Sequence, residues 1–276
     1  SEQGLQIGRM ISVRALGIEV PGVTVNRYCA SGLETIAMAT AKIRTGQAEC
    51  IIAGGTESMS LVPTAGWKTA PAYSVAKENA DYYLSMGLTA EAVAKEYNVS
   101  REDQDAFAFA SHQKAVSAIN EGRFKSGIVP INIEEVYLDA NGKKKTRTTV
   151  FDTDEGPRAD TDLQKLAKLK PVFDIAGSVT AGNASQTSDG AAFVLIVSEE
   201  MLKRLNVKPI AKLVSYSVAG VPPRIMGIGP VEAIPMALKA ANMKLQDIEL
   251  IELNEAFASQ SLAVIRTLGL NQDIVI

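Results

Sequence analysis

Residues 23–43, VTVNRYCASGLETIAMATAKI, place a cysteine where an apolar run ends and a helical pattern begins. Ser31 and Glu34 have the spacing of a capping box, in which both side chains accept hydrogen bonds from free amides at the start of a helix. Cys29 then precedes the first turn, where unpaired amides and the positive end of the helix dipole favour a thiolate. The segment predicts a nucleophilic cysteine, although an unreactive, buried cysteine fits the same residues.

Other residues with metal-binding or nucleophilic side chains are few. The sequence has two cysteines and one histidine, too few for a disulfide framework or for a zinc site with nitrogen and sulfur ligands. Cys50 opens an apolar strand pattern without a nearby cap or charge, so we interpret it as structural. His112 falls inside an amphipathic helical pattern, and we interpret it as structural or surface-exposed. We expect no metal ion and no bound cofactor.

The composition limits the class of protein. The chain has 28 basic and 31 acidic residues and a net charge of −3, which predicts no broad basic surface for nucleic acid. Its apolar runs are shorter than the roughly 18 residues that span a bilayer, and the opening SEQGLQIGRM has no signal-peptide pattern. We therefore expect neither a nucleic-acid partner nor a membrane span.

The order of the expected elements indicates an α/β protein. Before about residue 60, helices at 5–16 and 33–44 alternate with strands at 23–26 and 50–53, which implies a parallel sheet. The later elements are helices 90–97 and 101–121, a hairpin with its turn at Asn141-Gly142, strand 191–197, a helix capped by Ser198, strand 210–219, a helix ending near 241, strand 249–253 and helix 255–268. We predict the domain segments 1–60, 61–187 and 188–276, the second being an insertion.

Two of the expected helices lack a charged face. Not one charged residue lies between Glu34 and Lys42, or between Glu255 and Arg266. A helix without a charged face is usually buried on all sides. We therefore expect both helices to lie in the core.

Longer stretches of the chain resemble one enzyme family. The stretch VNRYCASGLETIAMATAKIRTGQAECIIAGGTESMS is similar to the nucleophilic-cysteine segment of the thiolases. Further stretches agree in the same order: GLTAEAVAKEYNVSREDQDAFAFASHQKA, LAKLKPVFD, VTAGNASQTSDGAA, MGIGPVEAI and IELNEAFASQSLAVI. The resemblance covers essentially the whole chain. It implies the five-layered αβαβα thiolase fold with an inserted α+β loop domain that binds coenzyme A (CoA).

The resemblance also implies a reaction. The thiolate of Cys29 attacks the 3-keto carbon of a 3-ketoacyl-CoA, acetyl-CoA leaves, and a second CoA accepts the acyl group. Asn254 corresponds to the asparagine that holds a water in the oxyanion hole, although ending a strand and capping the next helix would explain it equally well. The implied partners are CoA and acyl-CoA thioesters, with CoA as a substrate, and the implied assembly is a homodimer or a dimer of dimers.

The family pattern places the other substrate-binding residues along CoA. Arg158 corresponds to a position near the nucleotide, and Ala181, Gly182 and Ser185 correspond to positions along the pantetheine. Four apolar side chains correspond to the tunnel around that thin arm, although each of them taken singly fits an ordinary core: Met86, Phe173, Met226 and Phe257. The run Lys143-Lys144-Lys145 beside the hairpin turn contacts phosphates or forms a solvated basic edge.

Two features of the family are missing from this sequence. Thiolases carry a Gly-His-Pro motif, whose histidine deprotonates the nucleophile, and a later cysteine that protonates the enolate. The sequence has neither, and its first residues correspond to the middle of a family helix. We expect a fragment that is truncated at both ends and does not turn over alone. We also expect a cytoplasmic location of bacterial type, with organellar targeting left open.

Three functions fit these observations. The first is a degradative 3-ketoacyl-CoA thiolase of fatty acid β-oxidation, favoured by Ser85, because the acetoacetyl-CoA branch often has a histidine at that position. The second is that branch itself, acetoacetyl-CoA thiolase (acetyl-CoA C-acetyltransferase). The third is a non-catalytic CoA-binding or dimerisation module. A decarboxylating ketosynthase is disfavoured, because such enzymes usually have a histidine where Asn254 stands.

Overall fold

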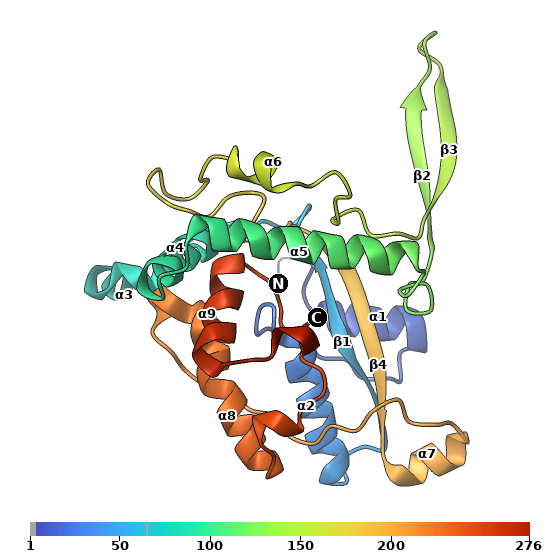
Figure 1. The fold of residues 1–276 in the computed structure, drawn as a ribbon. Helices are drawn as coiled ribbons and strands as arrows, with labels where there is room; N and C mark the ends of the chain where they lie inside the picture. Colours follow the sequence, from blue (N-terminus) through green and yellow to red (C-terminus); the bar gives the residue numbers. More distant parts are fainter. Residues whose placement is uncertain (1–3, 65) are drawn as a thin grey trace. The chain divides into compact units, whose positions relative to one another are not determined.

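Figure 1 shows the fold of the chain in a computed structural model, which describes residues 4–64 and 66–276. The chain forms two compact units, each assembled from three separate stretches of sequence. Unit 1 comprises Ser1–Tyr83, Thr187–Gly220 and Gly229–Glu249, and unit 2 comprises Leu84–Gln186, Val221–Ile228 and Leu250–Ile276. The domain limits that we predict from the sequence stay a prediction.

Unit 1 is built around one antiparallel strand pair. Its elements are α1 (Ile7–Leu16), α2 (Ser31–Arg44), β1 (Cys50–Ser58), α3 (Tyr73–Glu78), β4 (Asp189–Val197), α7 (Glu199–Leu205) and α8 (Gly229–Ala241), with short 3-10 turns at Ala80–Tyr83 and Leu245–Asp247. Strand β1 pairs with β4 so that Cys50 lies opposite Val197. Helix α2 contacts this pair, and the Thr35 hydroxyl donates to the Gly54 carbonyl of β1 at 3.1 Å.

The parallel sheet that we predict for unit 1 is wrong. Residues 23–26 and 210–219 form no strand, so β1 has no parallel neighbour among the described residues. It pairs instead with β4, more than a hundred residues later in the chain. By contrast, the prediction that Ser198 caps a helix is confirmed, because its side chain accepts from the Met201 amide at the start of α7.

The prediction that α2 is buried on all sides is also wrong. Within this helix only Ala39 is classed as buried, and Leu33 is 63% exposed. The uncharged stretch between Glu34 and Lys42 is rich in alanine and threonine. These small, uncharged side chains explain why the stretch has no charge, although the helix is not surrounded by the core.

Unit 2 is mainly helical. Its elements are α4 (Met86–Glu96), α5 (Arg101–Asn120), β2 (Ile131–Leu138), β3 (Lys144–Phe151), α6 (Leu163–Ala167) and α9 (Ala258–Leu268), with 3-10 turns at Pro223–Ile228 and Gln272–Ile274. Helix α9 packs against α4 and α5, and all its residues from Ala258 to Ile265 are buried. The predicted burial of this uncharged helix is confirmed. The predicted strand 249–253 is reduced to one bridge between Ile251 and Val275.

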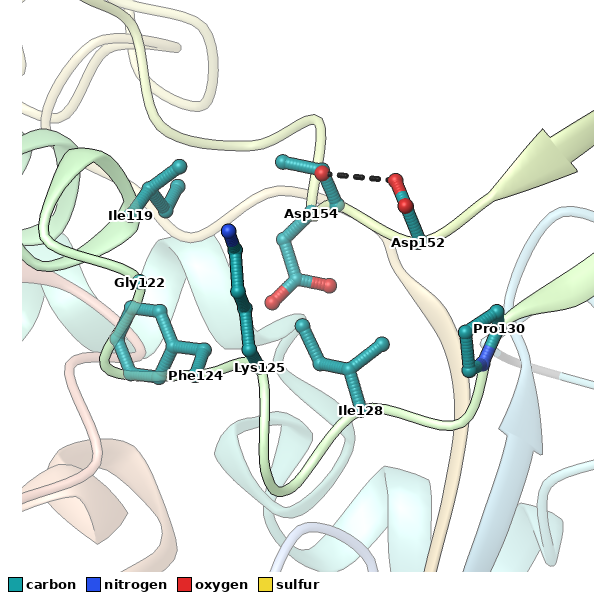
Figure 2. Close-up of a pocket in the computed structure, with 9 residues that line it drawn as sticks. Ile119, Gly122, Phe124, Lys125, Ile128, Pro130, Asp152 and Asp154 are labelled. Carbon is teal, nitrogen blue, oxygen red and sulfur yellow. Dashed lines mark hydrogen bonds between the residues drawn. The ribbon is translucent and has the colours of Figure 1, made fainter.

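The β2–β3 hairpin forms as the Asn141-Gly142 pair predicts. Gly142 takes the left-handed conformation, with φ +71°, and the Asp139 carboxylate accepts from the amides of Asn141 and Lys143. Figure 1 shows the hairpin extending beyond the last turn of α5. At its base is a pocket of about 390 Å³ (Figure 2), lined by Ile119, Gly122, Phe124, Lys125, Ile128, Pro130, Asp152, Thr153 and Asp154.

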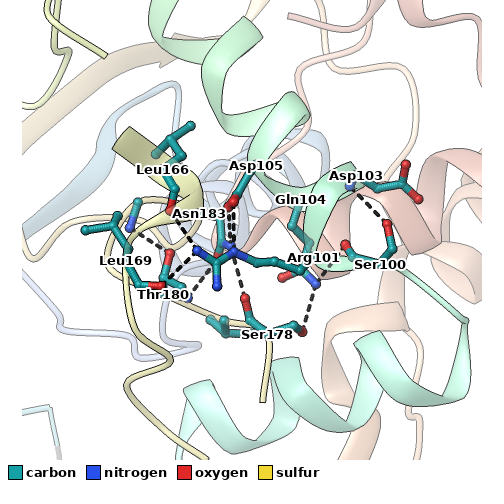
Figure 3. Close-up of polar contacts among 12 residues, drawn as sticks. Ser100, Arg101, Asp103, Gln104, Asp105, Leu166, Leu169, Ser178, Thr180 and Asn183 are labelled. Carbon is teal, nitrogen blue, oxygen red and sulfur yellow. Dashed lines mark hydrogen bonds and ion pairs between the residues drawn. The ribbon is translucent and has the colours of Figure 1, made fainter. Parts of the chain in front are cut away.

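A polar network on one face of α5 fixes the long loop after α6 (Figure 3). The Arg101 guanidinium donates to the carbonyls of Leu166 at 2.7 Å and Leu169 at 3.0 Å, and it pairs with Asp105 at 2.8 Å. Asp105 also accepts from the side chain of Asn183 at 2.9 Å. The loop forms only isolated backbone bridges, at Pro171–Thr180 and Ala184–Phe257, so these side chains of the helix contribute to its order.

Asn183 is the residue through which this network holds the turn at 180–185. It is only 3% exposed, and its side-chain oxygen Oδ1 accepts from the Thr180 amide at 2.8 Å. We expect Asn183→Ala to lower the free energy of unfolding by about 1 to 3 kcal/mol, because it leaves buried groups without partners. Urea unfolding measures the change. Asn132→Ala, on the exposed hairpin, is the control and should change stability by less than about 0.5 kcal/mol; equal effects would contradict the role of Asn183.

Candidate active site

The predicted nucleophile lies in a tight turn of unit 1. Cys29 is exposed and comes two residues before the first residue of α2. The preceding residue, Tyr28, has φ +48°, a left-handed conformation that costs a residue other than glycine roughly 1 to 2 kcal/mol. The Tyr28 amide donates to the Asn26 side chain at 2.8 Å. Local hydrogen bonds therefore hold the cysteine in a turn that the backbone alone disfavours.

The capping box predicted from Ser31 and Glu34 does not form. The N-cap of α2 is Ala30, without a side-chain hydrogen bond, and Ser31 is already helical. Its hydroxyl accepts from the Arg27 amide at 2.8 Å and donates to the Tyr28 carbonyl at 2.7 Å. Ser31 thus closes the turn around Cys29 instead of satisfying a helix amide.

Glu34 ties the same turn to a distant part of unit 1. Its carboxylate accepts from the Arg27 guanidinium at 2.5 Å and from the Tyr216 hydroxyl at 2.7 Å. The bond from Tyr216 and then that from Arg27 hold the pKa of Glu34 below its usual value. Burial, followed by the bond to Glu34, raises the pKa of Tyr216. Sequence reasoning missed Tyr216, because it stands 182 residues from Glu34.

In unit 2 the structure brings the predicted pantetheine residues beside the residues that follow Asn254. The Ser185 amide donates to the Ala256 carbonyl at 2.9 Å, and the Ala258 amide donates to the Asn183 carbonyl at 2.9 Å. Gly182 lies in a crowded position, because a Cβ there would come within 2.5 Å of the terminal methyl groups of Leu166 and Leu169, which would have to move. The turn at 181–185 and the segment before α9 therefore form one bonded layer.

The predicted tunnel residues fall into one aromatic contact and two exposed methionines. Phe173 and Phe257 meet edge to face, with ring centroids 6.1 Å apart. Met86, at the start of α4, is 44% exposed, and Met226 is 45% exposed. The alternative interpretation of these methionines as ordinary core residues is therefore wrong in this structure, although their contact with a substrate stays a prediction.

Asn254 is exposed and does not cap the following helix. The N-cap of α9 is Phe257, without a side-chain hydrogen bond. The capping explanation of Asn254 therefore fails, which leaves its amide side chain available to hold a water or a substrate oxygen.

Arg158 lies in a different loop of unit 2, and its backbone amide bonds to a side chain of α5. Its guanidinium pairs with Asp160 through two contacts of 3.2 Å, and its amide donates to Nδ1 of His112 at 3.1 Å. The Arg158 guanidinium lowers the pKa of Asp160 from its usual value. The interpretation of His112 as simply structural or surface-exposed missed this contact, because the two residues are 46 positions apart.

Comparison with known proteins decides the family. The model of the N-terminal thiolase domain matches residues 1–200, and that of the C-terminal thiolase domain matches residues 207–275. The chain belongs to the thiolase family. Over 276 residues this thiolase chain is 52% identical to the 3-ketoacyl-CoA thiolase of Bacillus subtilis, a match that covers 100% of the chain and 71% of the relative.

Two solved structures are similar to this thiolase chain. The acetyl-CoA acetyltransferase of Bacillus anthracis has a TM-score of 0.86 and 40% identity, over 99% of the chain and 70% of the relative. The dimeric peroxisomal thiolase of Saccharomyces cerevisiae has a TM-score of 0.84 and 37% identity, over 96% and 65%. The chain therefore has the thiolase fold and belongs to a family of acyltransferase enzymes.

Three further observations concern the described residues of the thiolase chain. In the part of the chain that the structure describes, no group of three or more His, Cys, Asp or Glu side chains is placed to hold a metal ion. Among the same residues, no helix is long and apolar enough to cross a membrane. The pocket at the base of the hairpin contains none of the predicted site residues.

Cys29 and Cys50 are both exposed, so their reactivity can be compared directly. Cys29 lies at the positive end of α2, whereas Cys50 is the first residue of β1. We expect limited iodoacetamide treatment at neutral pH to alkylate Cys29 at least about 2-fold faster, since a helix terminus stabilises an anion by about 0.3 to 1 kcal/mol. Peptide mass spectrometry of the wild type and of Cys29→Ala and Cys50→Ala measures both rates. Faster labelling of Cys50 would contradict the assignment of the nucleophile.

Proposed function

We propose that this chain provides the nucleophile for the acyl transfer of a degradative 3-ketoacyl-CoA thiolase, with Cys29 as the acyl-accepting thiol. The observation that carries the proposal is the exposed Cys29 in the turn before α2, within the residues that match the N-terminal thiolase domain. The name of the Bacillus subtilis relative supports the substrate class.

The proposed reaction has two transfers. The Cys29 sulfur forms a bond to the 3-keto carbon, the bond between carbons 2 and 3 breaks, and its electron pair leaves as the acetyl-CoA enolate, which takes up a proton. A second CoA thiol then gives up its proton and attacks the acyl-cysteine, which releases the shortened acyl-CoA. A cysteine suits both steps, because its thiolate is a good nucleophile and a good leaving group.

Asn254 has the role of a fixed dipole in this scheme. Negative charge develops on the thioester oxygen of the leaving enolate, and a preorganised donor in that place is worth roughly 3 kcal/mol. The exposed side chain of Asn254, which does not cap α9, supplies such a donor through a held water.

Acetoacetyl-CoA thiolase is the second candidate function. The similar structure from Bacillus anthracis is an acetyl-CoA acetyltransferase, which favours a short-chain substrate. Against it, Ser85 precedes Met86 and Gly87, and this position favours the degradative branch. We also propose a role in fatty acid β-oxidation, a homodimer or a dimer of dimers, and a cytoplasmic location, in keeping with the dimeric yeast relative for the assembly alone.

The proposed function is tested by looking for the acyl enzyme. We expect incubation with 3-ketoacyl-CoA thioesters of several chain lengths to leave an acyl group, one acetyl unit shorter than the substrate, on Cys29. Peptide mass spectrometry locates it, and Cys29→Ala should abolish the label while Cys50→Ala retains it. An acyl group on Cys50 would contradict the nucleophile. CoA binding without any acyl group would favour the non-catalytic module, and labelling by acetoacetyl-CoA alone would favour the short-chain branch.

Arg158 is proposed to contact the nucleotide of CoA. Its guanidinium is exposed and can pair with phosphate and stack on adenine. We expect Arg158→Ala to weaken CoA binding at least about 5-fold, the loss of a charge-assisted hydrogen bond, in calorimetric titrations. Arg123→Ala is the matched control, because Arg123 is also exposed and pairs with the nearby acid Glu121. An unchanged dissociation constant for Arg158→Ala would show that this residue is only a surface charge.

A further inference from the structure

His112 occupies a position that its sequence context does not explain. Nδ1 of its ring accepts the Arg158 amide at 3.1 Å. A backbone N–H can only donate, so Nδ1 must be unprotonated, and the neutral ring then carries its proton on Nε2. The bond therefore selects one of the two neutral tautomers and is incompatible with the doubly protonated ring.

The bond completes a row of contacts along one face of α5. His112 is eleven residues after Arg101, which is about three helical turns, so both side chains leave the same face. Arg101 holds the carbonyls of Leu166 and Leu169, and His112 holds the amide of Arg158. The two residues thus fix the two ends of the segment 158–169.

Between these anchors the segment is braced by its own backbone and by one cap. The Thr161 amide donates to the Arg158 carbonyl at 3.3 Å, which closes a turn. The Asp162 side chain accepts from the Lys165 amide at 2.7 Å and caps α6. Since Arg158 is the first residue of this turn, the His112 bond is what joins its backbone to α5.

The charged groups around His112 come from two other segments. Arg158 and Asp160 face it from the loop, and Glu255 faces it from the segment before α9, where Glu255 accepts from the Ser111 hydroxyl at 2.5 Å. Burial is the main cause that lowers the pKa of His112 from its usual value of about 6.5, and the Arg158 guanidinium adds to it, while Glu255 and Asp160 act in the opposite direction.

The direction of this shift fixes how stability depends on pH. The pKa of His112 is lower in the folded chain than in the unfolded chain, so the folded chain binds the proton less readily. At a pH above the pKa of the unfolded state, the neutral ring therefore adds to the free energy of unfolding. That contribution is lost as the pH falls through the folded pKa. Acid therefore removes the acceptor and places a positive ring against Arg158.

We propose that His112 is a positioning residue for CoA: its neutral ring holds the turn that presents Arg158 to the nucleotide, and protonation of the ring releases that turn and weakens CoA binding. The proposal rests on the proposed function, because it assumes that Arg158 contacts CoA. It adds a residue that touches no substrate and makes the affinity for CoA dependent on pH.

The first arm of the test needs no CoA. His112 is the only histidine of this chain, so its ring nitrogens give single, assignable signals in nitrogen-15 NMR. We expect an unprotonated Nδ1 and a protonated Nε2 at neutral pH, with slow exchange of the Arg158 amide that becomes fast as the ring is protonated. A ring protonated on Nδ1 at neutral pH, or an Arg158 amide that exchanges equally fast at every pH, would overturn the proposal.

The second arm measures CoA affinity from about pH 8 to about pH 5, the range in which a histidine titrates. His112→Asn keeps an acceptor near the place of Nδ1 but does not titrate, and His112→Leu removes the acceptor. We expect His112→Leu to bind CoA about 2- to 10-fold more weakly at neutral pH, the equivalent of one hydrogen bond. His112→Asn should bind CoA nearly as tightly as the wild type at neutral pH. On acidification, its affinity for CoA should fall less than that of the wild type.

Comparison with His112→Asn removes the contribution of the phosphates of CoA, which also titrate in this range. The matched control is Gln113→Leu, an exposed neighbour on α5, which should bind as the wild type does. If His112→Leu bound CoA as tightly as the wild type, or if the wild type and His112→Asn had identical pH profiles, the positioning role of His112 would be overturned. The proposed function would not be affected by either result. A wild-type chain that does not bind CoA at all would overturn the proposed function and this proposal with it.

Discussion

The loop between α6 and β4, residues 168–188, forms only isolated bridges, at Pro171–Thr180 and Ala184–Phe257. Many of its polar groups therefore find partners on side chains. Helix α5 supplies some of these partners from one face, where Arg101 binds the carbonyls of Leu166 and Leu169 and Asp105 binds the side chain of Asn183. Helix α4 adds Glu91, whose carboxylate accepts from the amides of Ser178 and Val179. Each buried group in this network costs energy unless it is paired. Most of these groups are paired, with Oε1 of Gln104 an exception, and this requirement favours one conformation of the loop.

The turn around Cys29 in unit 1 is also held by hydrogen bonds from side chains to its backbone. Tyr28 is held in a left-handed conformation, and Ser31 and Glu34 supply the bonds that keep it there. Such strain persists only where the surroundings over-determine the backbone. In both units, side chains that do no chemistry fix the backbone that carries the proposed chemistry.

Local signals in the sequence predict the local structure well. The Asn141-Gly142 turn, the Ser198 cap and the long α5 are all present in the structure. The resemblance to thiolases also located the family correctly. The errors concern partners distant in the sequence: nothing near β1 indicates that it pairs with β4, and the spacing of Ser31 and Glu34 cannot show that Tyr216 and Arg27 compete for the glutamate. A pattern of spacing specifies which bonds are possible within a helix, whereas tertiary contacts decide which of them form.

The bond between the Arg158 amide and His112 bears on two possible roles of this histidine, as a positioning residue and as a general base. A lone histidine in an enzyme that needs a general base is an obvious candidate for that role. However, a base needs a free lone pair, and the only lone pair on a neutral ring is already used at Nδ1 by the Arg158 amide. While that bond holds, the ring can donate from Nε2 but cannot accept the proton of a thiol. The geometry that makes His112 a positioning residue therefore excludes it as the base for Cys29, and that proton must pass to another group.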